Sequence, residues 1–254
     1  MKKITLLFLS ILTISCSLKQ TQKFLNSGNY DVAINKAVEA LQKNKTAKGK
    51  QDYIYILEEA FAKANERDLD RINLLKKENN PANYEQIFTI YNQLKNRQEK
   101  IKPLLPLSLI KESRMAKFNL VDYNEKLVLS KKELSNYLYN NAQSLLKSNN
   151  KMDFRKAYDD LQYLLELNGN YENATTLLDQ ALAKGIDYVY VYTKNETGMV
   201  IPERLQNDLL DFSTYGLNDT WTVYNSNKQK NIAYDYGMIV NFRQITISDR
   251  KSVV

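Results

Sequence analysis

The sequence predicts a mostly α-helical protein that ends in a small α+β domain. From Ser17 to about Gly185, apolar residues recur at intervals of three and four, which is the period of an amphipathic helix. Beyond Gly185 the interval falls to two, the period of a β-strand. We therefore expect a helical domain over residues 16–185 and an α+β domain over residues 186–254.

Within the helical domain, two apolar faces and two start signals define helices. The faces consist of Ile54, Leu57, Phe61 and Ala64, and of Tyr84, Ile87, Phe88, Tyr91 and Leu94. Pro81 after Asn80 suits a first helical position, where its missing N–H has no partner to lose. Ser130 followed by Glu133 has capping-box spacing and predicts another helix start. Prolines at 103 and 106 break the helices, so a loop and one weak helix are expected from there to Ser130.

Three segments of the α+β domain have the alternation of strands. They are Tyr188–Tyr192, Thr220–Tyr224 and Ile232–Ile247, and a helix over Pro202–Phe212 is expected between the first two. In the last segment the apolar residues change parity near Arg243, which predicts a bulge or a break there.

The place of this last strand in the sheet stays open among three arrangements. It could lie at the centre, it could be an edge that accepts a strand from a partner, or it could be completed by further residues if the chain is a truncated form. Apolar residues on both sides of Gly237 favour the central position, because central strands are buried on both faces.

A pattern of aromatic, small and apolar residues returns three times in the helical domain. The three sets are Tyr30, Ala33 and Ala40; Tyr84, Ile87 and Tyr91; and Phe154, Ala157 and Leu161. They resemble the second helix of a tetratricopeptide repeat, and the resemblance implies paired helices with a concave protein-binding face. The intervals from Ala33 to Ile87 and on to Ala157 are 54 and 70 residues, against about 34 in that family. A helical bundle with accidental spacing is the alternative.

The N-terminus has the pattern of an export signal. Lys2 and Lys3 precede an apolar run, Ile4–Ile14, that is too short to span a bilayer and ends in Ser15–Cys16. We expect a signal peptide over residues 1–15.

The residues before Cys16 resemble the lipobox of bacterial lipoproteins, with Thr13 where leucine is usual. The resemblance implies that Cys16 becomes the acylated first residue; an ordinary secretory signal is the alternative. Residues 17–20 include no acid, which by resemblance implies an outer-membrane anchor facing the periplasm. The Asn-, Lys- and Ile-rich composition is similar to that of lipoproteins of the Bacteroidota.

The amino-acid composition excludes several kinds of catalytic and binding site. The 254 residues include no histidine and one cysteine, which excludes catalytic triads and dyads built on histidine and histidine-ligated zinc. No glycine pattern for phosphate binding is present, and a net charge of +7 without a reading motif does not indicate nucleic acid. The acidic doublets Glu58–Glu59 and Asp159–Asp160 point apart on a helix and are expected to be solvated. We expect no catalytic, metal-binding or cofactor-binding residues.

Two hypotheses about function follow. The favoured one is a lipid-anchored, non-enzymatic scaffold or adaptor that binds another envelope protein through its helical repeats. The alternative is an envelope hydrolase or glycan-binding lipoprotein with its site in the tyrosine-rich C-terminal part. There Tyr188, Tyr190 and Tyr192 form a stripe that could stack a sugar or peptide, or could instead be a half-buried sheet face under a helix.

Overall fold

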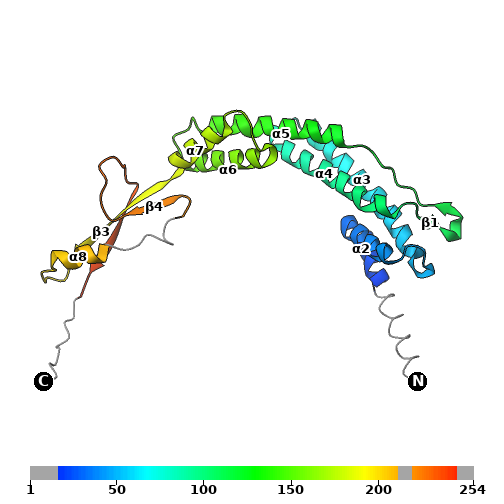
Figure 1. The fold of residues 1–254 in the computed structure, drawn as a ribbon, viewed down its shortest axis with the longest axis horizontal. Helices are drawn as coiled ribbons and strands as arrows, with labels where there is room; N and C mark the ends of the chain where they lie inside the picture. The colour runs from blue at the N-terminus through cyan, green and yellow to red at the C-terminus, as the bar shows by residue number, and fades with distance from the viewer. Residues whose placement is uncertain (1–16, 211–218, 245–254) are drawn as a thin grey trace, which may run out of the picture. The chain divides into compact units, whose positions relative to one another are not determined.

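A computed structural model describes residues 17–210 and 219–244 of the chain. The chain is mostly helical up to Gly185 and then forms a three-stranded sheet, so the predicted fold class is confirmed (Figure 1). It divides into two compact units, the first ending at Tyr137 and the second beginning at Leu138. The division falls inside helix α5 (Asn124–Leu145), whereas the sequence period changes near Gly185.

The first unit begins with a helix over residues 17–26. The elements that follow are α2 (Tyr30–Lys43), η1 (Lys48–Lys50), α3 (Gln51–Lys77), η2 (Pro81–Asn83), α4 (Tyr84–Ile101), η3 (Lys102–Leu104), β1 (Ser108–Leu109), η4 (Ile110–Glu112), β2 (Arg114–Met115) and α5, where η marks a 3-10 turn. The second unit holds α6 (Lys151–Asn168), α7 (Ala174–Gly185), β3 (Asp187–Asn195), α8 (Glu203–Leu210), β4 (Thr222–Asn225) and β5 (Tyr236–Phe242).

Small residues let α2 and α3 pack closely. Ala33 and Ala37 on α2 and Ala60 and Ala64 on α3 are completely buried in the shared core, where their small size lets the two helices approach closely. The predicted face of α3 is buried in this core as well. A second core joins the end of α3 to α4 and is formed by Ile72, Leu75, Ile87, Ile90, Tyr91, Leu94 and Tyr123.

One predicted helix start is confirmed and the other is wrong. Pro81 opens η2, where the Asn80 side chain accepts a hydrogen bond from the backbone N–H of Ala82. Ser130 lies inside α5 instead of capping it: its side chain is buried and donates to the carbonyl of Leu127. Where α5 does begin, the Asp122 side chain accepts a hydrogen bond from the N–H of Asn124. Capping-box spacing also occurs within helices, so spacing alone could not separate the two cases.

The proline-containing stretch forms a hairpin. Strands β1 and β2 are antiparallel, with Ser108 opposite Met115 and Leu109 opposite Arg114. The expected weak helix is only the 3-10 turn η4 between them. After β2 the chain runs without further regular structure from Ala116 to Tyr123, and residues 117–123 of this stretch are called the crossing segment below.

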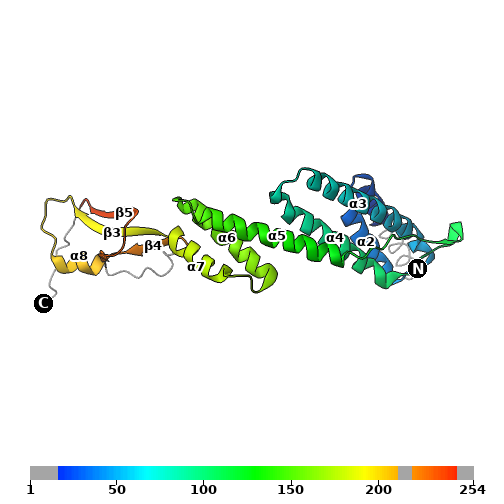
Figure 2. The same ribbon diagram turned by 90° about the horizontal axis from the view of Figure 1, so that it is seen from above.

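The sheet of the second unit is parallel, in the order β4-β3-β5, with β3 between its two neighbours (Figure 2). The three predicted strands are present, but the last is shorter than predicted and ends just before Arg243, where the parity changes. Among the described residues β5 is an edge strand, so the favoured central position is wrong. Its Met238 and Ile239 are about half exposed, at 51% and 47%. An apolar sequence on both sides of a strand therefore did not mean burial here.

Within the second unit, the sheet contacts the helix pair α6–α7 through the ring of Trp221 and the cations of Arg155 and Lys151. The ring of Trp221 lies edge-on to Tyr158, with centroids 5.2 Å apart, and under the guanidinium of Arg155. Arg155 donates to the carbonyl of Gly185, and Lys151 donates to that of Ile186. Both cations also bind Asp187, at 2.6 and 3.0 Å. Burial raises the pKa of Asp187, but these bonds outweigh it and hold the pKa below the ordinary value.

Candidate functional site

The residues predicted to pack the repeats lie in separate cores and do not form one site. Of the three sets listed above, the α2 set packs with α3, the α4 set lies in the second core and the α6 set is buried in the second unit. Ala33, Ala157 and Leu161 are completely buried, whereas Tyr30, Ala40 and Tyr84 are only partly covered. The described helices are thus packed in pairs, as the resemblance implied. Cys16 lies outside the described residues.

The predicted tyrosine stripe finds partners within its own sheet. The rings of Tyr190 and Tyr192 stack on each other, with centroids 5.4 Å apart and planes 19° from parallel. Tyr234 lies against Tyr190 at 5.5 Å. The ring of Tyr192 also covers Gly237 on β5, where a Cβ atom would lie 3.3 Å from the ring. These contacts favour a packing role for the stripe.

A groove of about 600 Å³ lies in the first unit, between α3 and the crossing segment. We call it the α3 groove. Its helix wall consists of Phe61, Ala62, Asn65, Glu66, Leu69, Asp70 and Asn73, and its other wall of Lys117, Asn119, Val121 and Tyr123. The first set has the three-and-four spacing of one helix face, and the second set consists of alternate residues, as in a strand. The buried lining residues are the aromatic Phe61 and Tyr123, whereas the charged ones, Glu66, Asp70 and Lys117, are exposed, so the floor is apolar and the rim is polar.

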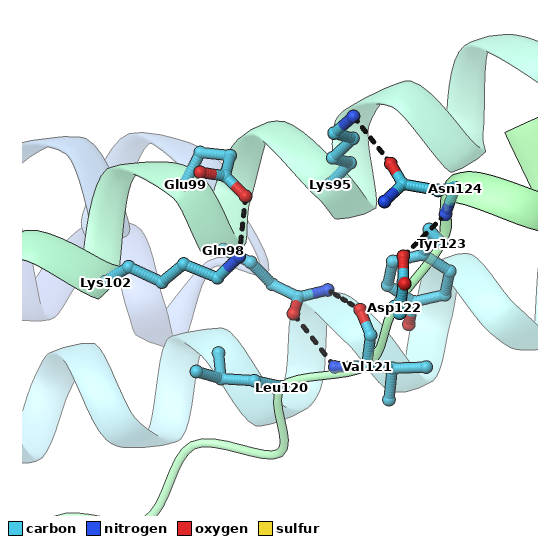
Figure 3. Close-up of a pocket in the computed structure, with 9 residues that line it drawn as sticks. All are labelled: Lys95, Gln98, Glu99, Lys102, Leu120, Val121, Asp122, Tyr123 and Asn124. Carbon is cyan, nitrogen blue, oxygen red and sulfur yellow. Dashed lines mark hydrogen bonds and ion pairs between the residues drawn. The ribbon is translucent and has the colours of Figure 1, made fainter.

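Two side chains hold the crossing segment against the helices. Gln98 on α4 donates from its amide nitrogen to the carbonyl of Val121 and accepts from the N–H of the same residue, at 3.0 and 2.9 Å (Figure 3). Glu58 on α3 accepts two hydrogen bonds from Arg114 and one from the N–H of Lys117. Glu58 is therefore not solvated as predicted, and the Arg114 bonds keep its pKa below the ordinary value. Glu59 is solvated, paired only with Lys63.

The crossing segment also borders a second cavity, of about 340 Å³, shown in Figure 3. Its polar groups are largely engaged with one another: Lys95 donates to Asn124, Lys102 donates to Glu99, and Asp122 accepts from the N–H of Asn124. These contacts connect the end of α4 to the start of α5. We attribute a structural role to this cavity.

An ion-pair network centred on a buried arginine connects α2, α3 and α4 of the first unit. The guanidinium of Arg97 on α4 donates to Asp31 on α2, and to Asn65 and Asp68 on α3, at 2.6 to 3.0 Å. The side chains of Arg97 and Asp68 are 2% and 7% exposed. This network could not be predicted from the sequence, because the partners of Arg97 are 29 to 66 residues away from it and each looks like an ordinary surface side chain.

Sequence reasoning also missed the α3 groove. Leu69 and Val121 are exposed apolar residues, 39% and 43%, that belong to different elements and meet only in the folded chain. Within residues 17–210 and 219–244, no three acidic or cysteine side chains gather as ligands for a metal ion. None of the helices in these ranges combines the length and the apolar character needed to cross a bilayer.

Comparison of the chain with protein-family models, curated proteins and solved structures found no match.

Proposed function

We propose that this protein is a lipid-anchored, non-enzymatic scaffold or adaptor of the bacterial outer membrane, facing the periplasm, that binds another envelope protein through its helical first unit. The observation that carries the proposal is the α3 groove. It combines an apolar floor with a polar rim, which is the composition of protein-binding surfaces. The tightly packed helices around it provide a rigid frame, so that binding requires little ordering of the site.

The ion pairs formed by the buried acidic side chains support a non-enzymatic function. Acid catalysis by carboxylates requires two acids at a defined separation, one of them with a raised pKa. The best-buried acids instead serve structure: Asp68 pairs with Arg97, Glu58 with Arg114, and Asp187 with Lys151 and Arg155. The pKa values of Glu58 and Asp187 are lowered, not raised.

The binding function is tested by site-specific photo-crosslinking in living cells. A photoreactive amino acid at Leu69 lies in the α3 groove, whereas one at Leu74 is exposed on the same helix and does not line the groove. We expect the Leu69 position to capture a defined envelope protein and the Leu74 position not to. The same products from both positions, or none from either, would contradict a binding function for the groove.

The anchor is tested by replacing its proposed attachment residue. Cys16→Ser is expected to leave the chain unprocessed or to move it from the membrane fraction to the soluble fraction. The reason is that acyl chains contribute about 0.8 kcal/mol of membrane affinity for each buried CH₂ group. Fractionation and intact-mass measurement check this. A native mature chain that begins elsewhere and has no lipid would refute the proposed anchor, and protease digestion of the protein on unbroken cells would refute the periplasmic orientation.

A further inference from the structure

We propose that the α3 groove binds its partner as an extended, positively charged peptide segment, which pairs with the backbone of the crossing segment and places an apolar side chain on the groove floor. This inference rests on the proposed function and specifies its ligand. Three features of the groove carry it: unused backbone groups, an apolar floor, and two carboxylates on the rim that form no ion pair with a described residue.

The backbone of the crossing segment is used at both ends and free in the middle. The N–H groups of Lys117 and Val121 are bound by Glu58 and Gln98. Between them, the backbone groups of Phe118, Asn119 and Leu120 form no hydrogen bond with any residue that the structure describes. In a strand, the N–H and C=O of one residue point to the same edge, and successive residues point to opposite edges. The crossing segment is not part of a sheet, but its alternate residues line the groove as those of a strand would. By this rule the backbone groups of Phe118 and Leu120 point away from the edge that Gln98 binds.

The side chains around this edge have the alternation that strand pairing requires. Phe118 packs inward, with its ring edge-on to that of Phe61 and 5.4 Å between centroids. Its neighbours Lys117 and Asn119 line the α3 groove. A peptide added to such an edge gains affinity from main-chain hydrogen bonds and specificity from pockets for alternate side chains. The floor between Leu69 and Val121 is the pocket for an apolar one.

The two carboxylates on the groove rim favour a partner segment of positive charge. Glu66 and Asp70 are four residues apart on α3, so they lie on one face, where like charges destabilise the helix. Both are exposed, and neither forms an ion pair with a described residue, whereas Glu59, two turns before Glu66, is paired with Lys63. The groove lining sets one cation, Lys117, against these two carboxylates. A lysine or arginine of a bound segment would relieve this repulsion. A helical partner segment would leave the free backbone groups of the crossing segment without partners, so the extended form is favoured.

The test measures fluorescence anisotropy of short labelled peptides with the full chain purified in detergent. The probes are a seven-residue peptide of alternating valine and lysine, the same peptide with glutamate for lysine, and the valine–lysine peptide N-methylated at alternate residues. We expect the valine–lysine peptide to bind with an affinity that falls as salt rises, because its charges are screened. The glutamate peptide and the N-methylated peptide should each bind at least tenfold more weakly.

Matched variants locate the binding. The pair Glu66→Gln and Asp70→Asn should weaken binding of the valine–lysine peptide about three- to tenfold, whereas the pair Glu39→Gln and Glu85→Gln, with the same change in charge, should not. Leu69→Ser should weaken binding and Leu74→Ser should not. Far-UV circular dichroism checks that every variant is folded, and all of the changed side chains are exposed to solvent.

Three outcomes would overturn the inference. Equal binding of the lysine and glutamate peptides would exclude selection by charge, and equal binding of the N-methylated peptide would exclude backbone pairing. Self-association of the chain that Leu69→Ser abolishes would assign the groove to a second copy. If crosslinking from Leu69 captures a partner but no peptide binds, the inference fails and the proposed function stands; if neither occurs, both fail.

Discussion

Arg97→Ala is expected to lower the free energy of unfolding of the first unit by about 3–5 kcal/mol. Arg97 compensates the charge of Asp68, and both side chains are almost completely buried. Removing the arginine leaves this carboxylate with only Arg67, whose side chain is 46% exposed. A buried charge that loses its main partner is costly because burial has already removed the water that would stabilise it.

Urea unfolding followed by far-UV circular dichroism, together with hydrogen exchange of amides in α3 and α4, measures this effect. Arg71→Ala is the control, since among the described residues Arg71 donates only to the exposed Gln86, and its loss should change stability by less than about 0.5 kcal/mol. Combining Arg97→Met with Asp68→Asn should recover much of the loss, because it removes the uncompensated charge as well. A loss as small as that of the control would mean that the network contributes nothing to stability.

Acid should weaken the same network. Burial raises the pKa of Asp31, but the ion pairs with Arg97 and Arg67 outweigh it and hold the pKa below the ordinary value of 3.8. A lowered pKa in the folded state means that the contribution is present above about pH 3.8 and is lost as the pH falls through the folded-state value. The difference in urea midpoint between the natural chain and Arg97→Ala should therefore be smaller at pH 3 than at pH 7.

The second large effect is expected at Gly185. A Cβ atom there would lie 2.6 Å from Cζ3 of Trp221 and 3.2 Å from Cγ of Arg155. Gly185→Ala must displace a ring that is fixed between Arg155 and Tyr158, and it should destabilise the second unit by about 1–3 kcal/mol. Trp221 is the only tryptophan of the chain, so its emission should shift to longer wavelength as the ring moves toward water.

Gly49→Ala is the matched control, since a Cβ atom there meets nothing within 4 Å and the backbone is not left-handed. A double-mutant cycle with Trp221→Leu tests the cause, because a smaller side chain at 221 should make the alanine at 185 less costly. Unchanged emission and stability in Gly185→Ala would show that the junction has room the structure does not indicate.

Periodicity predicted the parts of the fold that depend on local spacing. The helical faces around Ile54 and Ile87 and the strand around Val189 follow from residues a few positions apart, and the structure confirms them. The edge position of β5 could not be predicted, because it depends on which side of β3 the connection from β4 reaches. The α3 groove needs Leu69 and Val121 to meet across 52 residues, and no local pattern records that meeting.

The contacts at Trp221 also limit the positions at which recombination could divide the gene without disrupting the fold. Only Ile186 separates the last residue of α7 from the first residue of β3, and the contacts of Lys151 and Arg155 extend across that point to Asp187. Recombination at codon 186 would separate the sheet from Lys151 and Arg155, which bind its Asp187. It would also separate the sheet from Gly185, which lies against its Trp221. Exchange between related genes should therefore transfer α6, α7 and the sheet as one heritable block, even though the sequence pattern changes in its middle.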